Sequence, residues 1–365
     1  MAKIALMTLH AIKNYGSVLQ TFATKELFEE YGHEVELINY IREDALDKNL
    51  LSFWCGKNPA KRLAMLPTVI KWKSVFNDFL HQNFLLTRHT YTQPEDFKKY
   101  PIHADIYCTG SDQVWNTGWN GGIIRSLFFD FLPDDAFRFA YASSFGKKSL
   151  SKEEVDATRD YIRKYAFISV REDYAKDLLE KDYGYPNPVH LVDPTLAYSG
   201  NSWRYFAPPS KIREDYILVY NLNRSKNFDE YAKKLSRKTG LPVYFLCRRY
   251  DQILRPGKSI LIPEVFEFIT LIDNARYVLT DSFHATAFSL NLNTEPLCVY
   301  PDEYSGRIES VLRMTKTLQK HVKNYEDFDV IFRPIDFQEV NAVLAEERQK
   351  TRNYLNTVFS AYNQQ

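Results

Sequence analysis

Short apolar runs alternate with amphipathic stretches along most of the chain. The runs that predict buried strands in the first half are 3–9, 34–40, 106–109, 137–142, 166–170 and 189–192. Between the first two runs, the apolar side chains of Val18, Phe22 and Leu27 recur on one face of a predicted helix over 17–31. Gly32 follows at the position where a helix commonly ends. This half of the chain therefore predicts strands that alternate with helices.

The second half repeats the alternation. Its predicted strands are 216–221, 243–247, 277–280 and 297–300, and its predicted helices are 227–238, 263–274 and 282–291. The two halves meet in residues 198–213, where Gly200, Pro208 and Pro209 are typical of a linker. Because strands that alternate with helices form βαβ units, we expect α/β domains with mostly parallel sheets.

The length of the chain supports a division into two domains. One hydrophobic core rarely serves as many as 365 residues. We expect two Rossmann-like domains, 1–205 and 206–365. The second includes a terminal helix near 337–359, and packing of this helix on either domain stays open. Apolar residues make up 45% and charged residues 25%, which is ordinary for a globular protein. The net charge of +1 argues against a nucleic-acid-binding protein, which usually carries a basic excess.

Residues of about 45–98 interrupt the alternation inside the first domain. They contain two apolar stretches, 50–54 and 63–72. The basic residues within and beside these stretches are Lys57, Lys61, Arg62, Lys71 and Lys73. Two arrangements are open: an amphipathic element that rests on a membrane surface, or a helical insertion that packs on the sheet with solvated lysines. We expect the helical insertion and keep a peripheral membrane contact as the alternative.

Cysteine and histidine usage gives no sign of a metal site. The four cysteines, Cys55, Cys108, Cys247 and Cys298, lack zinc-like spacing, and the last three lie in predicted strands. The eight histidines are scattered, and none forms His-Glu-x-x-His. The chain opens with an apparent strand instead of a signal peptide, and no apolar run reaches the ~18 residues that span a bilayer. We therefore expect a cytoplasmic protein without a bound metal.

Polar loops follow several predicted strands at their carboxyl ends, where open parallel sheets bind ligands. After the first strand, Asn14, Tyr15 and Gly16 lead into a helix whose free N–H groups suit an anion. The alternative is an ordinary turn that Ser17 caps. No Gly-x-Gly-x-x-Gly occurs here, so we expect no dinucleotide cofactor.

The loop after residue 109 concentrates hydrogen-bonding side chains beside a tryptophan. Its candidate substrate contacts are Ser111, Asp112, Gln113, Trp115 and Asn116. A ring beside a carboxylate suits a sugar, since the ring stacks on an apolar sugar face and the carboxylate accepts from hydroxyls. Asp112 is therefore a candidate general base. The alternative is a structural turn that the Asp side chain closes.

Two further loops carry positive charge. Ser144 and Lys147 form either an anion-binding corner or a solvated charged loop. Arg171 lies at the start of a predicted helix, where a cation is unfavourable unless an anion lies between it and the helix. The alternative for Arg171 is a pairing with Glu172, Asp173 or another carboxylate.

In the second domain, the sequence Asp-Ser-Phe-His at 281–284 links a predicted strand to a predicted helix. His284 falls in the first turn of that helix, where a protonated imidazole is disfavoured. A neutral ring at this position could act as a base or as a phosphate contact. The alternative is a histidine that only caps the helix or bridges the domains.

Taken in order, these segments resemble the polysaccharide pyruvyl transferase family over about residues 4–315. The segments that carry the resemblance are Asn-Tyr-Gly-Ser-Val-Leu-Gln at 14–20, Gly-Ser-Asp-Gln-Val-Trp-Asn at 110–116, Ser-Phe-Gly at 144–146, Val-Arg-Glu at 170–172, Val-Asp-Pro-Thr at 192–195, Thr-Asp-Ser-Phe-His-Ala at 280–285 and Gly-Arg-Ile at 306–308. The run at 110–116 is specific, and the ordered set covers most of the chain.

The resemblance implies a fold like that of the GT-B glycosyltransferases, with a cleft between the domains. It implies transfer of pyruvate from phosphoenolpyruvate onto two hydroxyls of a sugar in a cell-surface polysaccharide precursor, which forms a cyclic ketal. The acceptor is then a sugar or a lipid-linked oligosaccharide, and no cofactor is required. By the same resemblance, His284 is the acid/base or phosphate contact and Arg171 is the anion clamp. Asp112 and Asn14 face the acceptor or donor, and Arg307 is a second candidate clamp.

One position departs from the family pattern. Several members carry an arginine two residues before the motif histidine, where this chain has Ser282. Either Arg307, Lys147 or Lys148 supplies that charge, or the donor differs. Two other functions therefore stay open: a GT-B-type glycosyltransferase that uses a nucleotide sugar, and a non-catalytic sugar-binding assembly protein. With a lipid-linked acceptor, we expect the protein at the inner face of the membrane.

Overall fold

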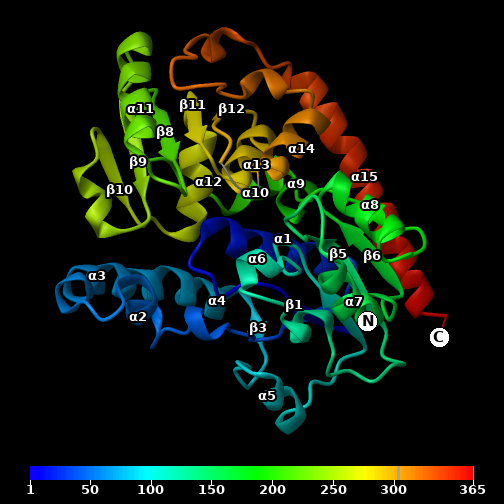
Figure 1. The fold of residues 1–365 in the computed structure, drawn as a ribbon. Helices are drawn as coiled ribbons and strands as arrows, with labels where there is room; N and C mark the ends of the chain where they lie inside the picture. The colour runs from blue at the N-terminus through cyan, green and yellow to red at the C-terminus, as the bar shows by residue number, and fades with distance from the viewer. Residues whose placement is uncertain (302–304, 365) are drawn as a thin grey trace. The chain divides into compact units, whose positions relative to one another are not determined.

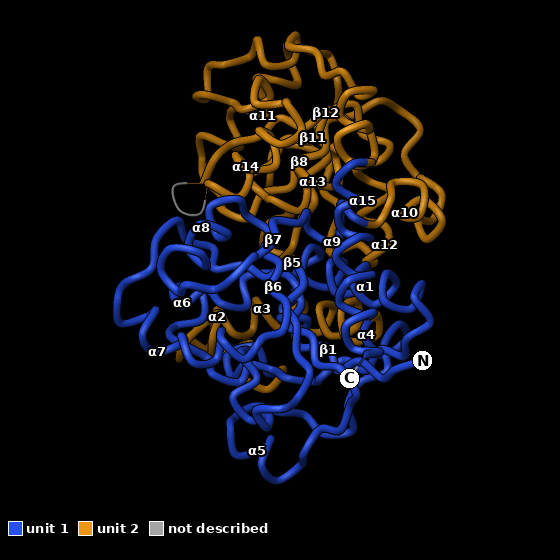
Figure 2. Tube along the Cα trace, turned by 90° about the vertical axis from the view of Figure 1, so that its right-hand side faces the viewer, with its two compact units in different colours: residues 1–46, 80–197, 346–365 blue, residues 47–79, 198–345 orange. Residues whose placement is uncertain are grey.

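The computed structural model describes residues 1–301 and 305–364, and the chain divides into two compact units (Figure 1, Figure 2). Unit 1 comprises residues 1–46, 80–197 and 346–365, and unit 2 comprises residues 47–79 and 198–345. Each unit contains its own parallel β-sheet, which confirms the predicted fold class of two Rossmann-like α/β domains. The predicted cleft between the domains stays a prediction.

The sheet of unit 1 has seven strands in the order β3-β2-β1-β4-β5-β6-β7, and every neighbouring pair is parallel. The strands are β1 (Lys3–Met7), β2 (Glu34–Leu37), β3 (Leu85–Leu86), β4 (Ile106–Thr109), β5 (Arg138–Ser143), β6 (Phe167–Val170) and β7 (Val189–His190). The central strands β4 and β5 are buried along their whole length, as is usual for parallel strands covered on both faces. The strand order reverses between β1 and β4, which is where such sheets bind ligands.

Several helices of unit 1 begin at a side chain that caps the first turn. The helices of this unit are α1 (Tyr15–Glu29), α5 (Pro94–Lys99), α6 (Thr117–Asn120), α7 (Lys152–Ile162), α8 (Asp173–Lys181) and α9 (Pro194–Ala197), and α4 (Asp78–Asn83) continues into this unit from unit 2. The side chain of Asn14 accepts a hydrogen bond from the Gly16 amide at 2.9 Å and so caps α1. Ser151 and Glu154 form a reciprocal capping box at the start of α7.

The sheet of unit 2 has five parallel strands in the order β10-β9-β8-β11-β12. The strands are β8 (Ile217–Tyr220), β9 (Val243–Cys247), β10 (Lys258–Leu261), β11 (Tyr277–Thr280) and β12 (Glu295–Cys298). The helices are α2 (Leu50–Cys55), α3 (Pro59–Trp72), α10 (Gly200–Phe206), α11 (Lys226–Thr239), α12 (Val265–Asp273), α13 (Phe283–Asn291) and α14 (Gly306–Met314). The sequence predicted the other four strands of this sheet but not β10.

Residues 47–79 are helical and pack with unit 2, whereas the sequence was interpreted as an insertion in the first domain. The indole Nε1 of Trp72 donates to the carbonyl oxygen of Arg248 at 2.7 Å. The Tyr250 amide donates to Oγ1 of Thr68 at 3.0 Å. These contacts join α3 to the segment that follows β9, so the insertion interacts with a part of the chain far away in the sequence.

Helix α15 (Phe337–Tyr362) starts in unit 2 and ends in unit 1. The sequence assigned this helix to the second domain and left open which domain it packs on. The Tyr354 hydroxyl donates to the carbonyl oxygen of Ala140 in β5 at 2.7 Å. The rings of Phe28 and Phe359 have centroids 5.9 Å apart. The domain boundary was expected near residue 205, and the longer segment of unit 2 begins at Tyr198.

Candidate functional site

The polar residues predicted in the first half of the chain lie beyond the carboxyl ends of four neighbouring strands in unit 1. Asn14, Tyr15 and Gly16 follow β1, and residues 111–116 follow β4. Ser144 and Lys147 follow β5, and Arg171 follows β6. Parallel strands present their carboxyl ends at one edge, so the sheet brings these loops to a common side.

Arg171 lies in a buried cluster with three carboxylates. Its Nη1 is 2.7 Å from Asp193 Oδ2, its Nε is 3.1 Å from Glu172 Oε1, and its Nη2 is 3.9 Å from Asp112 Oδ1. The Arg171 and Glu172 side chains are 1% exposed and that of Asp193 is 0% exposed. Burial alone would lower the pKa of Arg171, but the charges of Glu172, Asp193 and Asp112 outweigh it and raise the pKa.

The structure therefore shows the carboxylate pairing that was the alternative for Arg171. A guanidinium held by these carboxylates orients them and offsets part of their charge. From the sequence, Glu172 was named as a possible partner of Arg171, and Asp193 was not. The signal for Asp193 was available, because it lies in the segment 192–195 that carries the family resemblance.

Asp112 combines an unusual backbone conformation with a fixed carboxylate. Its φ angle of 72° lies in the left-handed region, which Asp tolerates better than most residues. The Ser17 hydroxyl donates to Asp112 Oδ2 at 2.8 Å, and the Gln113 amide donates to Oδ1 at 2.9 Å. The Asp112 carboxylate therefore accepts from its own loop and also links the loop after β4 to helix α1. These contacts leave little freedom in the direction of the carboxylate.

A second series of hydrogen bonds, which does not include Asp112, connects the same loops. Gln20 Nε2 donates to Thr8 Oγ1 at 3.0 Å, and Thr8 Oγ1 donates to the Ser111 carbonyl oxygen at 2.8 Å. Ser111 Oγ donates to Asp193 Oδ2 at 3.1 Å. The network joins β1, α1, the loop after β4 and the loop after β7. Thr8 and Gln20 were not predicted as site residues, although Gln20 ends the first family segment.

Gly146 is required where the loops after β4 and β5 meet. Its φ angle is +65°, and a Cβ atom on it would overlap the side-chain amides of Asn116 and Gln113. Those two amides are joined by a hydrogen bond from Asn116 Nδ2 to Gln113 Oε1 at 2.6 Å. The Gly146 amide donates to Ser144 Oγ at 3.0 Å. The predicted residues Gln113, Asn116 and Ser144 are thus brought together around one glycine.

Two predicted contacts have partners within unit 1 that account for their positions. Lys147 Nζ is 2.7 Å from Glu154 Oε1. Burial alone would raise the pKa of Glu154, but hydrogen bonds from Lys147, Thr117 and the Ser151 amide lower it to about 2.

Trp115 is the second of these residues. It is 2% exposed, and its ring stacks on Phe128 with centroids 5.4 Å apart. Its Nε1 donates to the Leu127 carbonyl oxygen at 3.3 Å. Trp115 thus lies in the hydrophobic core, whereas its place beside Asp112 in the sequence predicted that it would stack on a sugar. The residues between Trp115 and Phe128 show no regular hydrophobic pattern, so the sequence did not predict that Phe128 would stack on the Trp115 ring.

In unit 2, the turn after β11 has the strand-to-helix geometry that the sequence predicted. Ser282 is the N-cap of α13, and its Oγ accepts from the Ala285 amide at 3.4 Å. His284 follows in the first turn and is buried. Asp281 Oδ1 and Oδ2 accept from the amides of Leu222 and Asn223 at 2.6 and 2.9 Å. Asp281 therefore ties this turn to the loop after β8.

The pKa of Asp281 reflects two opposing effects. Burial disfavours the charged form and raises the pKa, while the hydrogen bonds from the Leu222 and Asn223 amides and the nearby charge of Arg248 lower it. Burial prevails, and the pKa is raised. Arg248 directly follows β9, and its Nη2 donates to the Leu222 carbonyl oxygen at 3.4 Å. This arginine was not predicted as a site residue, although the strand-end rule points to it.

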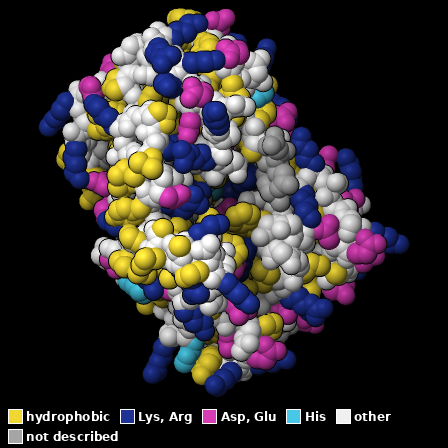
Figure 3. Space-filling model, turned by 60° about the vertical axis from the view of Figure 1, so that its left-hand side comes forward, with side chains coloured by type: hydrophobic (Ala, Val, Ile, Leu, Met, Phe, Trp, Pro, Cys, Tyr) yellow, Lys and Arg dark blue, Asp and Glu magenta, His cyan; other side chains and the backbone are white. Residues whose placement is uncertain are grey.

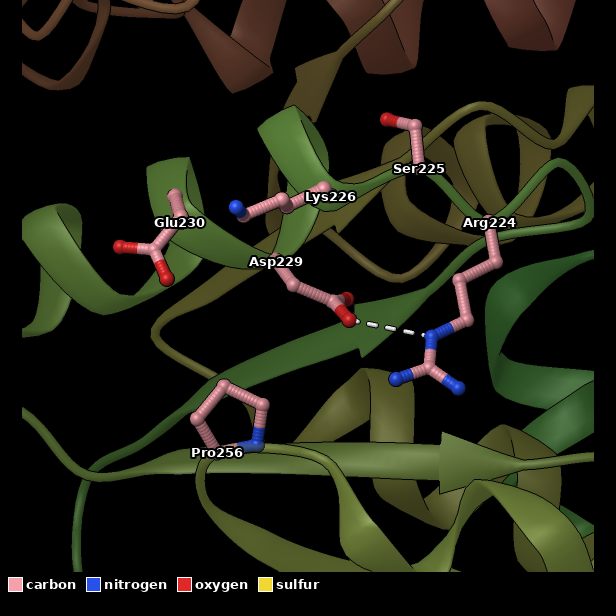
Figure 4. Close-up of a pocket in the computed structure, with 6 residues that line it drawn as sticks. All are labelled: Arg224, Ser225, Lys226, Asp229, Glu230 and Pro256. Carbon is pink, nitrogen blue, oxygen red and sulfur yellow. Dashed lines mark hydrogen bonds and ion pairs between the residues drawn. The ribbon is translucent and has the colours of Figure 1, made fainter.

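A hollow of about 390 Å³ lies at the N-terminus of α11 (Figure 4). It is lined by Arg224, Ser225, Lys226, Asp229, Glu230 and Pro256. Figure 4 shows Arg224 turned toward Asp229, with Arg224 Nε 3.1 Å from Asp229 Oδ2. Ser225 caps the helix by accepting from the Phe228 amide at 3.1 Å. The hollow adds two cationic side chains to the loop after β8.

Arg307, the second candidate clamp, lies in the first turn of α14. The candidate residues of the first domain all lie in unit 1, and Ser282, His284 and Arg307 lie in unit 2. Among the described residues, no group of three or more His, Cys, Asp or Glu side chains is arranged to hold a metal ion.

A family model described as polysaccharide pyruvyl transferase matches residues 14–303. The chain belongs to the polysaccharide pyruvyl transferase family. The match includes Asn14, Asp112, Arg171 and His284, and Arg307 lies just beyond it. The family is an enzyme class, so the candidate residues belong to an enzyme that acts on a polysaccharide or its precursor. No curated protein sequence matches the chain.

Solved structures similar to this family member support the GT-B-like fold. The Staphylococcus aureus protein MnaA bound to UDP is 9% identical, with a TM-score of 0.54 over 99% of this chain and 97% of that one. The protein LpCGTa in complex with UDP is 11% identical, with a TM-score of 0.51 over 99% of each chain. The UDP-GlcNAc 2-epimerase of Methanocaldococcus jannaschii is 14% identical, with a TM-score of 0.50 over 91% of this chain and 92% of that one. Identities this low support the fold alone.

Proposed function

We propose that the protein transfers pyruvate from phosphoenolpyruvate onto two hydroxyls of one sugar in a cell-surface polysaccharide precursor. In this reaction the methylene carbon of the donor gains a proton, and the neighbouring carbon forms bonds to both sugar oxygens. Its bond to the phosphate oxygen breaks, so a cyclic ketal and phosphate result. The two sugar hydroxyls lose two protons. One offsets the proton that the methylene carbon gains as it becomes a methyl group, and the other leaves with the phosphate. The observation that carries the proposal is the family membership of a chain whose motifs meet in the network around Asp112.

Asp112 is the residue of unit 1 best suited to act on a hydroxyl. Its carboxylate is held by Ser17 and the Gln113 amide, with Arg171 behind it. A carboxylate with a fixed direction can accept a sugar hydroxyl, and it can take the proton as that oxygen attacks. In this proposal Arg171 is a positioning residue that keeps Asp112, Glu172 and Asp193 together. We propose this role for Arg171 in place of the anion clamp that the family resemblance implied.

His284 is the corresponding candidate in unit 2. It lies in the first turn of α13, whose N-terminal dipole disfavours a charged imidazole. A neutral ring could accept a proton or hold a phosphate oxygen through its N–H group. The donor carries both a phosphate and a carboxylate, so positive charge is also required. Arg248 and Arg224 follow strands β9 and β8, and we assign them the charge that Ser282 lacks, with Arg307 as a further source.

We further propose that the acceptor is a sugar or lipid-linked oligosaccharide and that the reaction takes place in the cytoplasm at the inner face of the membrane. The free thiols of Cys108, Cys247 and Cys298, all buried, are consistent with a reducing compartment. Phosphoenolpyruvate is the donor substrate in this proposal, and no other cofactor takes part.

The proposal is tested by phosphate release from phosphoenolpyruvate across a panel of acceptor sugars, with the product mass checked for the ketal increment. Wild type is expected to release phosphate only with a suitable acceptor, and His284→Ala is expected to lose most of this turnover. No release with any acceptor of the panel, or full turnover by His284→Ala, would contradict the proposed reaction or the role of His284 respectively.

A nucleotide-sugar glycosyltransferase is the second candidate function. The hollow at the start of α11 favours it, because a helix N-terminus beside Arg224 and Lys226 suits a diphosphate. Thermal unfolding with each donor separates the two candidates, since a ligand at about 100 times its Kd adds about 2.7 kcal/mol. Stabilisation by phosphoenolpyruvate supports pyruvyl transfer. Stabilisation by a UDP-sugar and none by phosphoenolpyruvate supports the glycosyltransferase.

A further inference from the structure

Helix α3 of unit 2 is apolar on two opposite faces. Met65, Val69 and Trp72 are buried against the unit. Leu63 and Ile70, seven residues apart and so two turns along one face, are 74% and 59% exposed. Leu66 lies on the same face and is also exposed, so one stripe of the helix presents large apolar side chains to water.

The stripe is part of a larger surface. In α2, Phe53 and Trp54 are exposed, and in the segment Tyr250–Leu254 the exposed side chains include Ile253 and Leu254. The Tyr250 amide binds Thr68 of α3, and the Arg249 guanidinium lies 5.7 Å from the Trp54 ring, so the two segments are in contact. We call the exposed side chains of Phe53, Trp54, Leu63, Leu66, Ile70, Tyr250, Ile253 and Leu254 the apolar patch. These eight make up more than half of the exposed large apolar side chains among the described residues.

The charged side chains of helices α2 and α3 and of the residues between them are all positive. Residues 50–72 include Lys57, Lys61, Arg62 and Lys71 and contain no Asp or Glu, which gives this segment a formal charge of +4 against +1 for the whole chain. Lys57, Lys61 and Arg62 are exposed, while Lys71 pairs with Glu264 at 2.8 Å. Figure 3, which brings the side with α2 and α3 forward, shows apolar groups gathered among Lys and Arg side chains.

We infer that the apolar patch docks on a lipid surface that carries anionic headgroups. Leu and Ile side chains would enter the acyl boundary, and the Trp54 ring suits the headgroup level. Exposed lysines beside them would meet the anionic headgroups. The helices lie on such a surface, since no helix among the described residues is long and apolar enough to cross a bilayer.

The charge distinguishes a lipid from a second copy of the chain. A symmetric dimer formed through this surface would bring the same basic segment of each copy toward the other, which costs energy. An anionic lipid surface complements the basic residues and accepts the apolar ones at the same time. The inference does not depend on the proposed reaction, because it concerns a surface of unit 2 and a property that is measured without substrate.

The test is sedimentation of the full-length protein with vesicles, either of phosphatidylcholine alone or of phosphatidylcholine with phosphatidylglycerol at about 3:1. The variant L63S/I70S removes apolar side chains, and K57Q/K61Q removes charge. The matched control L318S/F332S removes exposed apolar side chains outside the patch. We expect wild type to bind the anionic vesicles, L63S/I70S to bind about tenfold more weakly or worse, and the control to bind like wild type. K57Q/K61Q should lose most of the preference for anionic vesicles.

Other outcomes overturn the inference. They are no binding of wild type to anionic vesicles, equal binding to both kinds of vesicle, and binding of L63S/I70S at wild-type strength. A concentration-dependent dimer that L63S/I70S abolishes, without vesicle binding, would assign the patch to a second copy instead. The altered side chains are exposed, so all variants are expected to keep the thermal midpoint of wild type.

Discussion

Nη1 of Arg171 lies 2.7 Å from Oδ2 of Asp193, in a place where neither side chain is more than 1% exposed. The first residue follows β6 and the second follows β7, so this ion pair joins two neighbouring loops at the carboxyl edge of the sheet. With Glu172 and Asp112 also within 3.9 Å of the guanidinium, one cation faces three anions. The pair therefore matters to the stability of the unit as well as to the direction of Asp112.

Arg171→Met should destabilise the protein by about 3–5 kcal/mol, because it leaves buried carboxylates without their cation. Urea unfolding at pH 7 measures this loss of stability. Lys181→Met, at an exposed pair with Asp177, serves as the control and should leave the free energy of unfolding unchanged. A near-neutral Arg171→Met would show that the cluster is stable without the guanidinium.

Asp112→Asn should remove catalysis while the fold is kept. Asn tolerates the left-handed backbone, and its amide can still contact Ser17. Loss of the base should reduce kcat by about 10²–10⁴ with little change of Tm. Asp135→Asn, at an exposed position of the same unit, is the control and should keep full kcat. An Asp112→Asn enzyme with kcat like that of wild type would remove Asp112 from the chemistry.

Gly146→Ala should cost about 2–4 kcal/mol, because the new Cβ combines a strained φ with overlap of the Asn116 and Gln113 amides. Gly184→Ala is matched in φ, at +63°, but has open space around the added atom. It should cost only about 1 kcal/mol. Denaturant unfolding of the two variants separates crowding from backbone strain. Equal losses would mean that the two amides move aside freely.

The raised pKa of Asp281 predicts a pH dependence of stability. The folded state binds this proton more tightly than the unfolded state, so its contribution to stability is greatest below pH 3.8. The contribution falls as pH rises from 3.8 through the folded pKa. The difference in unfolding free energy between wild type and Asp281→Asn should therefore decline over this window.

Glu154→Gln provides a control of opposite sign. The pKa of Glu154 is lowered from 4.5 to about 2, so the wild-type advantage over this variant should grow as pH rises from about 2 to 4.5. A flat or rising difference for Asp281→Asn, measured together with the expected rise for Glu154→Gln, would show that folding does not raise the pKa of Asp281.

Arg248→Gln tests which residue replaces the family arginine at Ser282. If Arg248 holds an anionic group of phosphoenolpyruvate, its loss should raise KM for this donor by roughly tenfold or more, with a smaller effect on kcat. Arg249→Gln removes the adjacent guanidinium, which pairs with Asp251 at 2.9 Å, and should leave KM unchanged. An unchanged KM in Arg248→Gln would show that Arg248 does not bind the donor and would leave Arg224 and Arg307 as the candidates.

The sequence predicted the strand-end loops well, because hydrophobic periodicity locates buried strands and a parallel sheet fixes where their loops lie. It did not predict β10, since Lys258–Leu261 is short and mostly half-buried, and its apolar signal is weak. It placed an insertion of about residues 45–98 in the first domain, whereas residues 47–79 group with unit 2. The contact between Trp72 and Arg248 joins residues far apart in the sequence, and no local pattern encodes it.

Side-chain roles were harder to predict than positions. The sequence identified Arg171 as a cation at the start of a helix, where positive charge is unfavourable. Its carboxylate partners, however, come from three different loops. Only the assembled sheet shows that they meet. Trp115 likewise was expected near a sugar, and its contact with Phe128 places it in the core. The local sequence identifies a polar or aromatic side chain at an unexpected position, such as a cation at a helix start. The tertiary structure determines which residues that side chain contacts.

Helix α15 has a consequence for how the protein is made. Unit 1 contains residues 346–365, and Tyr354 and Phe359 contact strand β5 and helix α1. During synthesis from the N-terminus, the sheet of unit 1 emerges from the ribosome early, but the helix that covers it emerges about 150 residues after α9. Until then its uncovered apolar surface is a candidate binding site for chaperones.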